Sequence, residues 1–391
     1  ESAAVIASAV TNCQGLHFYK DVLFAVGKGP EGDGVHRLTD EDKDGVFEKA
    51  ELIRGVDGGM GEHGPHAIMV GPDGRLYYNS GNHSHLKAPI DPASPLNVMY
   101  EGELLPHMND SRGHAAGIMA PGGEIYRSDD MGKTWKRIVG GYRNQYDFAF
   151  NSKAELFTFD SDMEWDIGVP WYRPVRVNHS PIGGELPATV DLGRGSPTGV
   201  TFYQGSQFPE EYRDRFFICD WSQGRILAVD LKPEGSSFRG RAKEMVTGQP
   251  LNCTDIEAGP DGCVYFSTGG RGTQGGLFRL KSTATASPKP APADWLAAAL
   301  DVESPLSSFA RKQVEAIKAA NADAWAGKLE EAARDASGRT TPARRVRSSP
   351  STAPRRRRPC SSPWRPTPRP TSAPGRSRCW ATTRPTPPAP C

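Results

Sequence analysis

Acidic residues and lysine are missing from one whole section of this 391-residue sequence. After Asp335 the chain has no Asp, Glu or Lys but thirteen Arg, and without those thirteen the formal charge of +1 becomes −12. The part before Asp335 is therefore acidic, and an acidic surface does not attract the phosphates of nucleic acid. We expect no nucleic-acid partner.

Long apolar runs and cysteine motifs are also missing. No run of eighteen apolar residues occurs, so the sequence predicts no transmembrane segment. The stretch 1–5 lacks the charged and apolar regions of a signal peptide. None of the seven cysteines forms C-x-x-C or C-x-x-C-H, which argues against a zinc ribbon and against c-type haem attachment.

A short phrase recurs along the first 285 residues. The sequence Gly-Pro-Asp-Gly before an apolar strand occurs at 71–78 and again at 259–266, with weaker copies at 121–126 and 150–157. A tight turn directly before alternating apolar residues is typical of a β-hairpin. Hairpins that recur without helices between them favour the blades of a β-propeller.

One further motif supports the same fold. Residues 128–135 fit the Asp-box pattern S-x-D-x-G-x-T-W, with Ser128, Asp130 and Trp135 at its defining positions. In this motif the Ser and Asp hold a hairpin turn while the Trp packs between blades. It indicates a propeller and carries no chemistry of its own.

The composition changes after residue 285. Residues 286–338 begin with a Pro-rich linker and continue with three predicted helices, a possible start of helical repeats. Residues 339–391 are rich in Arg, Pro, Ser and Thr, and such a mixture predicts disorder. Translation of a GC-rich gene out of frame gives the same composition; the alternative is an anion-binding patch at 355–358.

Several phrases in residues 10–280 carry a resemblance to a known family. They are Thr11-Asn-Cys-Gln-Gly-Leu16, Gly61-Glu-His-Gly-Pro-His66, Gly81-Asn-His83, Arg112-Gly-His-Ala-Ala-Gly117, Tyr142-Arg-Asn-Gln-Tyr146, Asp162-Met-Glu-Trp-Asp166, Pro170-Trp-Tyr-Arg-Pro174, Gly195-Ser-Pro-Thr-Gly199, Phe217-Ile-Cys-Asp-Trp-Ser222 and Gly269-Gly-Arg-Gly-Thr-Gln274. Together they resemble the membrane-bound dehydrogenases, also called haem-binding proteins, of planctomycetes and verrucomicrobia. That family is similar to the glucose/sorbosone dehydrogenases that use pyrroloquinoline quinone (PQQ).

The resemblance implies a fold and a location. It implies an all-β, six-bladed type of propeller over residues 1–285, with an N-terminal blade of the family missing from this chain. It also implies an exported or periplasmic protein that passes electrons to a cytochrome c. Two further departures from the family are a shorter segment between Gly184 and Pro187, and Ser222 where the sugar dehydrogenases have a cofactor-binding Lys.

The resemblance also implies roles for seven residues. In the sugar dehydrogenases an acid–His pair, here Glu62 and His63, removes the hydroxyl proton while hydride moves to the quinone. An Arg-Asn pair, here Arg143 and Asn144, contacts the cofactor. The last predicted blade offers further contacts to a quinone carboxylate, namely Thr254, Asp255 and Arg271.

Two acidic clusters predict calcium. The first matches the loop D-x-D-x-D-G-x5-E, which supplies oxygen ligands at alternate positions; it contains Asp40, Asp42, Asp44 and Glu51. The second corresponds to the place where the sugar dehydrogenases hold calcium near the cofactor; it contains Asp160, Asp162, Glu164 and Asp166. Carboxylates this close repel one another unless a cation or solvent intervenes.

Three functions remain open from the sequence. The first is a PQQ-type dehydrogenase that oxidises a sugar or polyol. The second is a non-catalytic propeller that binds a glycan or a partner protein and is coupled to a cytochrome. The third is a sialidase-like hydrolase, which rests only on the Asp box and ranks last because no blade-spaced set of Arg residues accompanies it.

Overall fold

The computed structural model describes residues 5–96, 108–109, 118–120, 122–161, 174–183, 186–284 and 291–338. The chain divides into two units, Glu1–Asp335 and Ala336–Cys391. Of the second unit, the described residues include only the end of the last helix, so the predicted disordered tail lies outside them. Everything below concerns the first unit.

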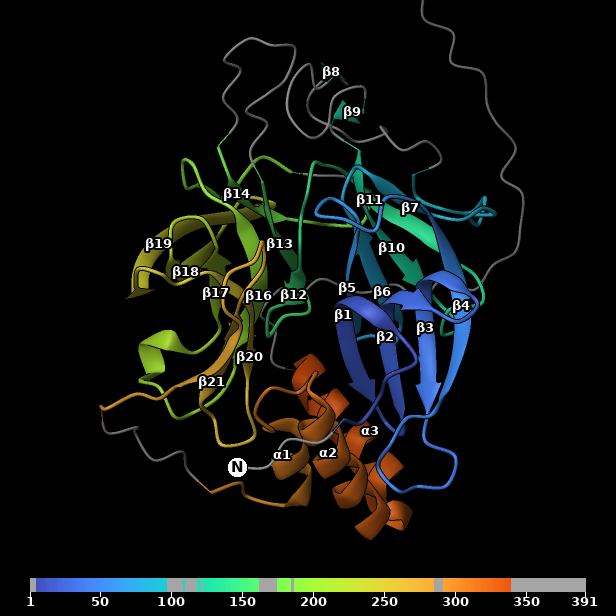
Figure 1. The fold of residues 1–391 in the computed structure, drawn as a ribbon. Helices are drawn as coiled ribbons and strands as arrows, with labels where there is room; N and C mark the ends of the chain where they lie inside the picture. The colour runs from blue at the N-terminus through green and yellow to red at the C-terminus, as the bar shows by residue number, and fades with distance from the viewer. Residues whose placement is uncertain are drawn as a thin grey trace, which may run out of the picture. The chain divides into compact units, whose positions relative to one another are not determined.

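Antiparallel sheets form the first two blades (Figure 1). Blade 1 has the order β1-β2-β3-β4-β7: β1 (Thr11–Tyr19), β2 (Val22–Gly29), β3 (Gly32–Thr39), β4 (Lys49–Gly58) and β7 (Ser84–Leu86). Blade 2 has the order β5-β6-β10-β11: β5 (Pro65–Val70), β6 (Leu76–Ser80), β10 (Gly123–Ser128) and β11 (Lys136–Tyr142). A separate pair joins β8 (Met108–Asn109) to β9 (Met119–Ala120).

Three more blades follow in chain order. Blade 3 contains β12 (Phe148–Phe150), β13 (Leu156–Asp160), β14 (Arg176–His179) and β15 (Val190–Asp191). Blade 4 contains β16 (Pro197–Tyr203), β17 (Arg215–Asp220), β18 (Arg225–Glu234) and β19 (Ser237–Thr247), with a short 3-10 turn at Glu210–Tyr212. Blade 5 contains β20 (Cys253–Ala258), β21 (Val264–Thr268) and β22 (Gly276–Leu280). The described residues thus form a five-bladed propeller arrangement, which confirms the predicted propeller.

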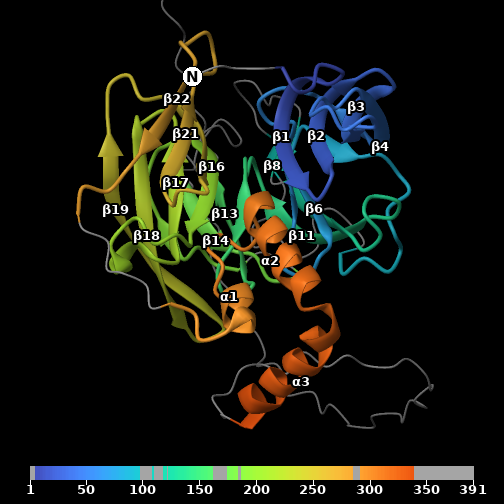
Figure 2. The same cartoon turned by 90° about the horizontal axis from the view of Figure 1, so that it is seen from below.

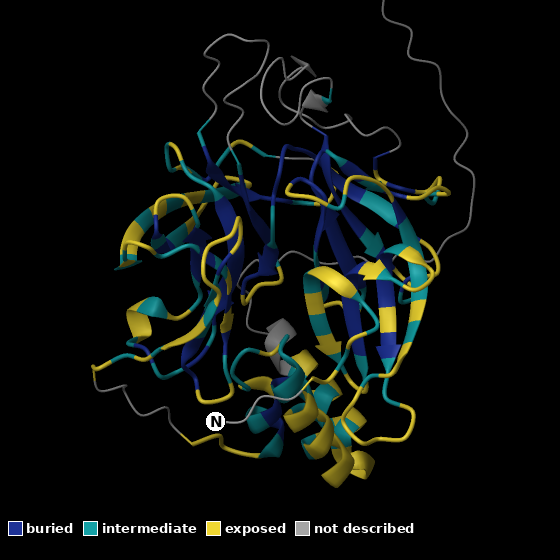
Figure 3. Cartoon of the chain, in the orientation of Figure 1, coloured by how far each residue is buried: buried dark blue, intermediate teal, exposed yellow. Residues whose placement is uncertain are grey.

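Residue alternation along the strands explains how the blades pack. Successive side chains of a strand point to opposite faces of its sheet, so Tyr78 faces blade 1 while Tyr77 faces blade 3. In blade 4, Phe216 faces blade 3 and Phe217 faces blade 5. Both faces of the central blades are therefore buried, as the dark blue strands of Figure 3 show. This is why their sequences are rich in aromatic and β-branched residues.

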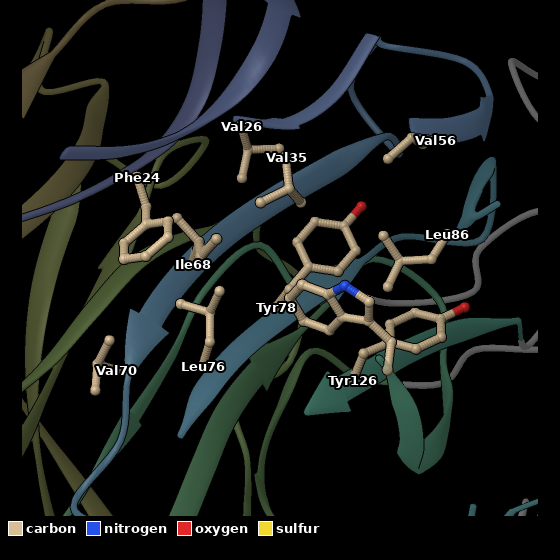
Figure 4. Packing of buried hydrophobic residues seen from close by; sticks show 11 residues of the cluster. Phe24, Val26, Val35, Val56, Ile68, Val70, Leu76, Tyr78, Leu86 and Tyr126 are labelled. Atoms are coloured by element: carbon tan, nitrogen blue, oxygen red, sulfur yellow. The ribbon is translucent and has the colours of Figure 1, made fainter. Parts of the chain in front are cut away.

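The core between blades 1 and 2 contains the Asp-box tryptophan. Trp135 is fully buried, donates its indole N–H to the Gly132 carbonyl at 2.8 Å, and meets the Tyr78 ring edge-on. Asp130 holds the turn by accepting from Ser128 Oγ and from the Thr134 N–H. Figure 4 shows the surrounding residues, which come from both blades. The motif has the structural role that the sequence predicted.

Blade 1 and blade 5 each have one face that packs against no other blade among the described residues. Among the described residues, four cores join the five blades in order, and none joins blade 5 to blade 1. Leu277 of β22 is 76% exposed and Leu16 of β1 is 61% exposed. Figure 2 shows β1 in the first blade of the series and β22 in the last.

Three helices follow the strands: α1 (Trp295–Leu300), α2 (Ser308–Ala320) and α3 (Ala322–Gly338). Asp294 and Ser307 cap the first two helices by accepting backbone N–H groups. Arg311 of α2 donates to the carbonyls of Val70 and Gly71 and lies over the Tyr19 ring, which attaches the helix to one end of the propeller. No described helix combines the length and the apolar character needed to cross a membrane.

Candidate functional site

Loops from several blades enclose a cavity of about 760 Å³. The loops precede the inner strands β5, β12 and β16 or follow β17 and β21. Arg311 holds α2 against the far end of β5, so the cavity lies at the end of the propeller opposite α2. A volume of this size is typical of a small-molecule site.

Most of the predicted cofactor and catalytic residues line this one cavity. They come from three loops and from strand β20, and they comprise Glu62, His63, Arg143, Asn144, Thr254 and Arg271. Asp255, the seventh, lines a second cavity that continues the first along the propeller axis. The two cavities share Gln14, Tyr146 and Thr254. The structure therefore brings the predicted set together, with Asp255 deeper in the channel.

His63 is almost fully buried and is oriented by an amide. Its Nδ1 lies 2.7 Å from Oδ1 of Asn82, and its ring lies 4.5 Å from that of His83. Because Oδ1 of an amide accepts, Nδ1 of His63 carries the proton, and Nε2 is the basic nitrogen of the neutral ring. The resemblance pairs this histidine with the acid Glu62, whereas in the structure Nδ1 of the ring bonds to Asn82.

Glu62 contacts the other side of the cavity. Its carboxylate forms an ion pair with Arg271, 209 residues further along the chain. The Arg271 guanidinium also lies over the ring of Trp221, 5.7 Å from its centre. Glu62 therefore joins the loop before β5 to the loop after β21, and its side chain is directed to Arg271 rather than toward the His63 ring.

Asn144 lies at the centre of the polar contacts. Its Nδ2 donates to the Glu62 carbonyl at 3.1 Å, and its Oδ1 accepts from Nε2 of His66 at 2.7 Å. Burial lowers the pKa of His66 to about 4, so this ring is neutral at physiological pH. The amide of Asn144 thereby fixes which nitrogen of His66 carries the proton.

Positive charge and a flat aromatic ring share the cavity. Arg143, Arg194 and Arg271 all contribute to its lining, and Trp221 presents its ring beside Arg271. Guanidinium groups bind carboxylates with paired hydrogen bonds, and a tryptophan face accommodates a planar ring system. This combination suits an anionic, planar ligand.

Below the cavity, three carboxylates line the channel: Asp147, Asp255 and Glu257. Loss of hydration on burial raises the pKa of Asp147 and of Asp255. The neighbouring negative charges of Asp255 and Glu257 raise the pKa of Asp147 further. The same causes raise the pKa of Glu257 to about 7. This part of the channel therefore favours protonated carboxyl groups and does not favour a quinone carboxylate beside Asp255.

The first predicted calcium loop forms the hairpin between β3 and β4. Ligand atoms of Asp40, Asp42 and Glu48 lie within 4.8 Å of one another. Asp44 lies in the same turn and accepts from the Val46 N–H. Glu51 belongs instead to β4, where it is the cross-strand partner of Arg37 and forms an ion pair with it. The acidic group thus contains Glu48 in place of the predicted Glu51.

The second predicted calcium cluster is described only at its first residue. Asp160 ends β13, and its carboxylate accepts from Arg176 and from three backbone N–H groups. Those bonds already occupy its oxygen atoms. Asp162, Glu164 and Asp166 lie outside the described residues.

Several site residues were not singled out for a role in the sequence. Asn82 lies two residues after the end of β6, Trp221 follows β17 directly, and Arg194 precedes β16. Asn82 and Trp221 do occur in the family phrases quoted above. Their positions at strand ends, where blade loops converge, would have been the signal to look for.

Known proteins resemble this chain only distantly. No protein-family model and no curated protein matches it. Among solved structures, a Thermus thermophilus protein described as an oxidoreductase (glucose dehydrogenase) is similar, with a TM-score of 0.46 and 19% identity over 68% of this chain and 82% of that one. The PQQ-bound aldose sugar dehydrogenase of Streptomyces coelicolor gives 0.45 and 15% over 67% and 75%. Another glucose dehydrogenase gives 0.45 and 16% over 67% and 79%.

Proposed function

We propose that this protein is a PQQ-type dehydrogenase that oxidises a sugar or polyol alcohol. The observation that carries the proposal is the convergence of Glu62–His63, Arg143–Asn144 and Arg271 on one cavity from three separate loops. Such convergence of a candidate base with cation-bearing groups is what an alcohol–quinone reaction requires.

The donor set of the cavity fits the cofactor. PQQ is a flat o-quinone with three carboxylates, and the cavity lining includes three arginines and a tryptophan. Arg143, Arg194 and Arg271 would hold the carboxylates, and Trp221 would lie against the ring system. When bound, the quinone supplies the acceptor for the hydride of the alcohol carbon.

The protein's own residues would do the rest. His63 takes the hydroxyl proton on Nε2, because its hydrogen bond to Asn82 keeps Nδ1 protonated. The Glu62–Arg271 ion pair crosses the cavity between blades 2 and 5 and fixes the position of the guanidinium. Asn144 joins the loop before β12 to blade 2 through its bonds to the Glu62 carbonyl and to His66.

Calcium, location and partner complete the proposal. The candidate calcium ligands are the Asp40, Asp42 and Glu48 group and, in the second cluster, Asp162, Glu164 and Asp166. From the family resemblance, the protein is exported, belongs with the haem-binding dehydrogenases, and passes electrons to a cytochrome c.

We also propose that the complete ring has six blades. Blade 5 and blade 1 share no core among the described residues, and each presents exposed leucine, Leu277 and Leu16. A sixth blade between them, as in the family, would cover both faces.

The test is dye reduction by the purified protein supplied with PQQ and calcium, with a panel of aldoses and polyols. We expect activity that falls at least about 100-fold in His63→Gln, the usual contribution of a general base. His85→Gln is the matched control, because His85 pairs with Glu124 outside the cavity. Tight glycan binding without any dye reduction would favour the non-catalytic module instead.

A further inference from the structure

A single buried carboxylate holds the loop that carries Arg143 and Asn144. Asp160, with no exposed surface, accepts the N–H of Asn144 at 2.8 Å and that of Arg143 at 3.1 Å. The same carboxylate accepts the N–H of Ser161 at 2.9 Å and pairs with the Arg176 guanidinium at 2.8 Å. The carboxylate therefore holds two backbone N–H groups of the loop and that of Ser161, and the Arg176 guanidinium neutralises its negative charge.

Blade 4 repeats this arrangement at the equivalent place. Asp220 ends β17 as Asp160 ends β13, and each is the cross-strand partner of the Arg that begins the next strand. Asp220 pairs with Arg225 at 3.0 Å and accepts the N–H of Ser196 at 2.8 Å. This repeat is an internal control. Asp220 holds the Ser196 loop as Asp160 holds the Asn144 loop, but the Ser196 loop does not make the hydrogen bonds of the Asn144 amide to Glu62 and His66.

The side chain of Asn144 depends on where its backbone is held. Nδ2 must reach the Glu62 carbonyl while Oδ1 reaches Nε2 of His66, at 3.1 Å and 2.7 Å. Both partners belong to the stretch around β5 in blade 2, whereas Asp160 belongs to blade 3. Asp160 of blade 3 thus holds the Asn144 amide, whose hydrogen bonds reach across to blade 2.

We propose that Asp160 is a positioning residue, which holds Asn144 in the place needed for ligand binding in the cavity. The inference rests on the proposed function and deepens it by assigning Asp160 to the loop rather than to calcium. Its carboxylate oxygens already accept from Arg176 and from three N–H groups, and the positive guanidinium beside them disfavours a cation.

The first variant is the pair Asp160→Asn with Arg176→Gln. Replacing both partners avoids an unpaired buried guanidinium, which is strongly destabilising. The matched control is Asp220→Asn with Arg225→Gln, because that pair is built alike at the neighbouring blade. Thermal unfolding of both proteins shows whether each is folded before the decisive readout is taken.

The decisive readout is the 15N spectrum of the His66 ring, assigned by its loss in His66→Gln. The wild type should show the Nε2–H tautomer and titrate near pH 4. We expect the Asp160 variant to show mixed tautomers and, because the Asn144 bond raises the pKa of this buried ring, a titration shifted to lower pH, and we expect the Asp220 variant to match the wild type. An unchanged His66 spectrum in the Asp160 variant, or equal changes in both variants, would overturn the inference.

Ligand affinity provides the second arm. Titration with PQQ and calcium should give binding that is on the order of tenfold weaker in the Asp160 variant, as for other residues that orient a ligand-contacting group. If the wild type itself does not bind PQQ, the proposed function fails, while the His66 spectrum still decides whether Asp160 positions Asn144.

Discussion

Amides hold the two central histidines of the cavity. His63 bonds to Asn82 and His66 bonds to Asn144, each at 2.7 Å. An amide fixes the tautomer of a ring without the negative charge that would favour the imidazolium. Each amide therefore fixes which nitrogen of its ring carries the proton, and for His63 this leaves Nε2 as the basic nitrogen, which agrees with a role as base.

The lowered pKa of His66 makes a prediction for stability. The ring stays neutral in the folded protein down to about pH 4 but takes up a proton near 6.5 when unfolded. Its contribution to stability is therefore complete above pH 6.5 and is lost as the pH falls toward 4. Relative to His66→Gln, the wild type should lose about 1.4 kcal/mol of unfolding free energy per pH unit in that range.

Urea denaturation at several pH values measures this difference directly. Comparing the two proteins cancels the other groups that titrate, including His17, whose pKa burial also lowers to about 4. A constant difference between wild type and variant from about pH 7 to 4, or one of opposite sign, would show that His66 is not held neutral.

At the scale of elements, helix α2 is attached to the propeller by one side chain in particular. Arg311 donates to the carbonyls of Val70 and Gly71 and lies over Tyr19, and burial lowers its pKa. These contacts join the helix to the ends of both β5 and β1. The helix thereby covers the end of the axial channel opposite the cavity.

Removing this contact should loosen the helix selectively. Arg311→Ala removes the hydrogen bonds to the carbonyls of Val70, Gly71 and Leu306, and we expect a loss of about 1–3 kcal/mol in stability. Hydrogen exchange should become faster in Ser308–Ala320 and remain unchanged in blade 4. Lys312→Ala, an exposed neighbour on the same helix, is the control and should change stability by less than about 0.5 kcal/mol. Equal effects of the two substitutions would contradict this account of the helix.

At the scale of the whole molecule, much of the fold could be predicted from the sequence. The repeated Gly-Pro-Asp-Gly turns lead directly into β6 and β21, and the Asp box forms the turn between β10 and β11, because these signals are local. The predicted helices lie close to α1, α2 and α3. The number of blades could not be read in this way, since it depends on how successive sheets pack.

The sequence predicted which residues belong to the site, but not which of them contact one another. Glu62, His63, Asn144 and Arg271 line one cavity because propeller loops converge at the axis. Which side chains pair there depends on distances across blades, so the bond of His63 to Asn82 and that of Glu62 to Arg271 could not be predicted. Asp160 was predicted as a calcium ligand because its bonds to the Asn144 loop are not visible in the sequence.

Calorimetric titration of the protein with PQQ and calcium measures whether the cavity recognises a planar carboxylated quinone. We expect one binding site, with at least about tenfold weaker affinity in Arg271→Gln, because hydrogen bonds to charged groups contribute strongly. Arg279→Gln, on the same blade but paired with Asp261 outside the cavity, should bind like the wild type. No binding by the wild type, or equal losses in the two variants, would contradict this expectation.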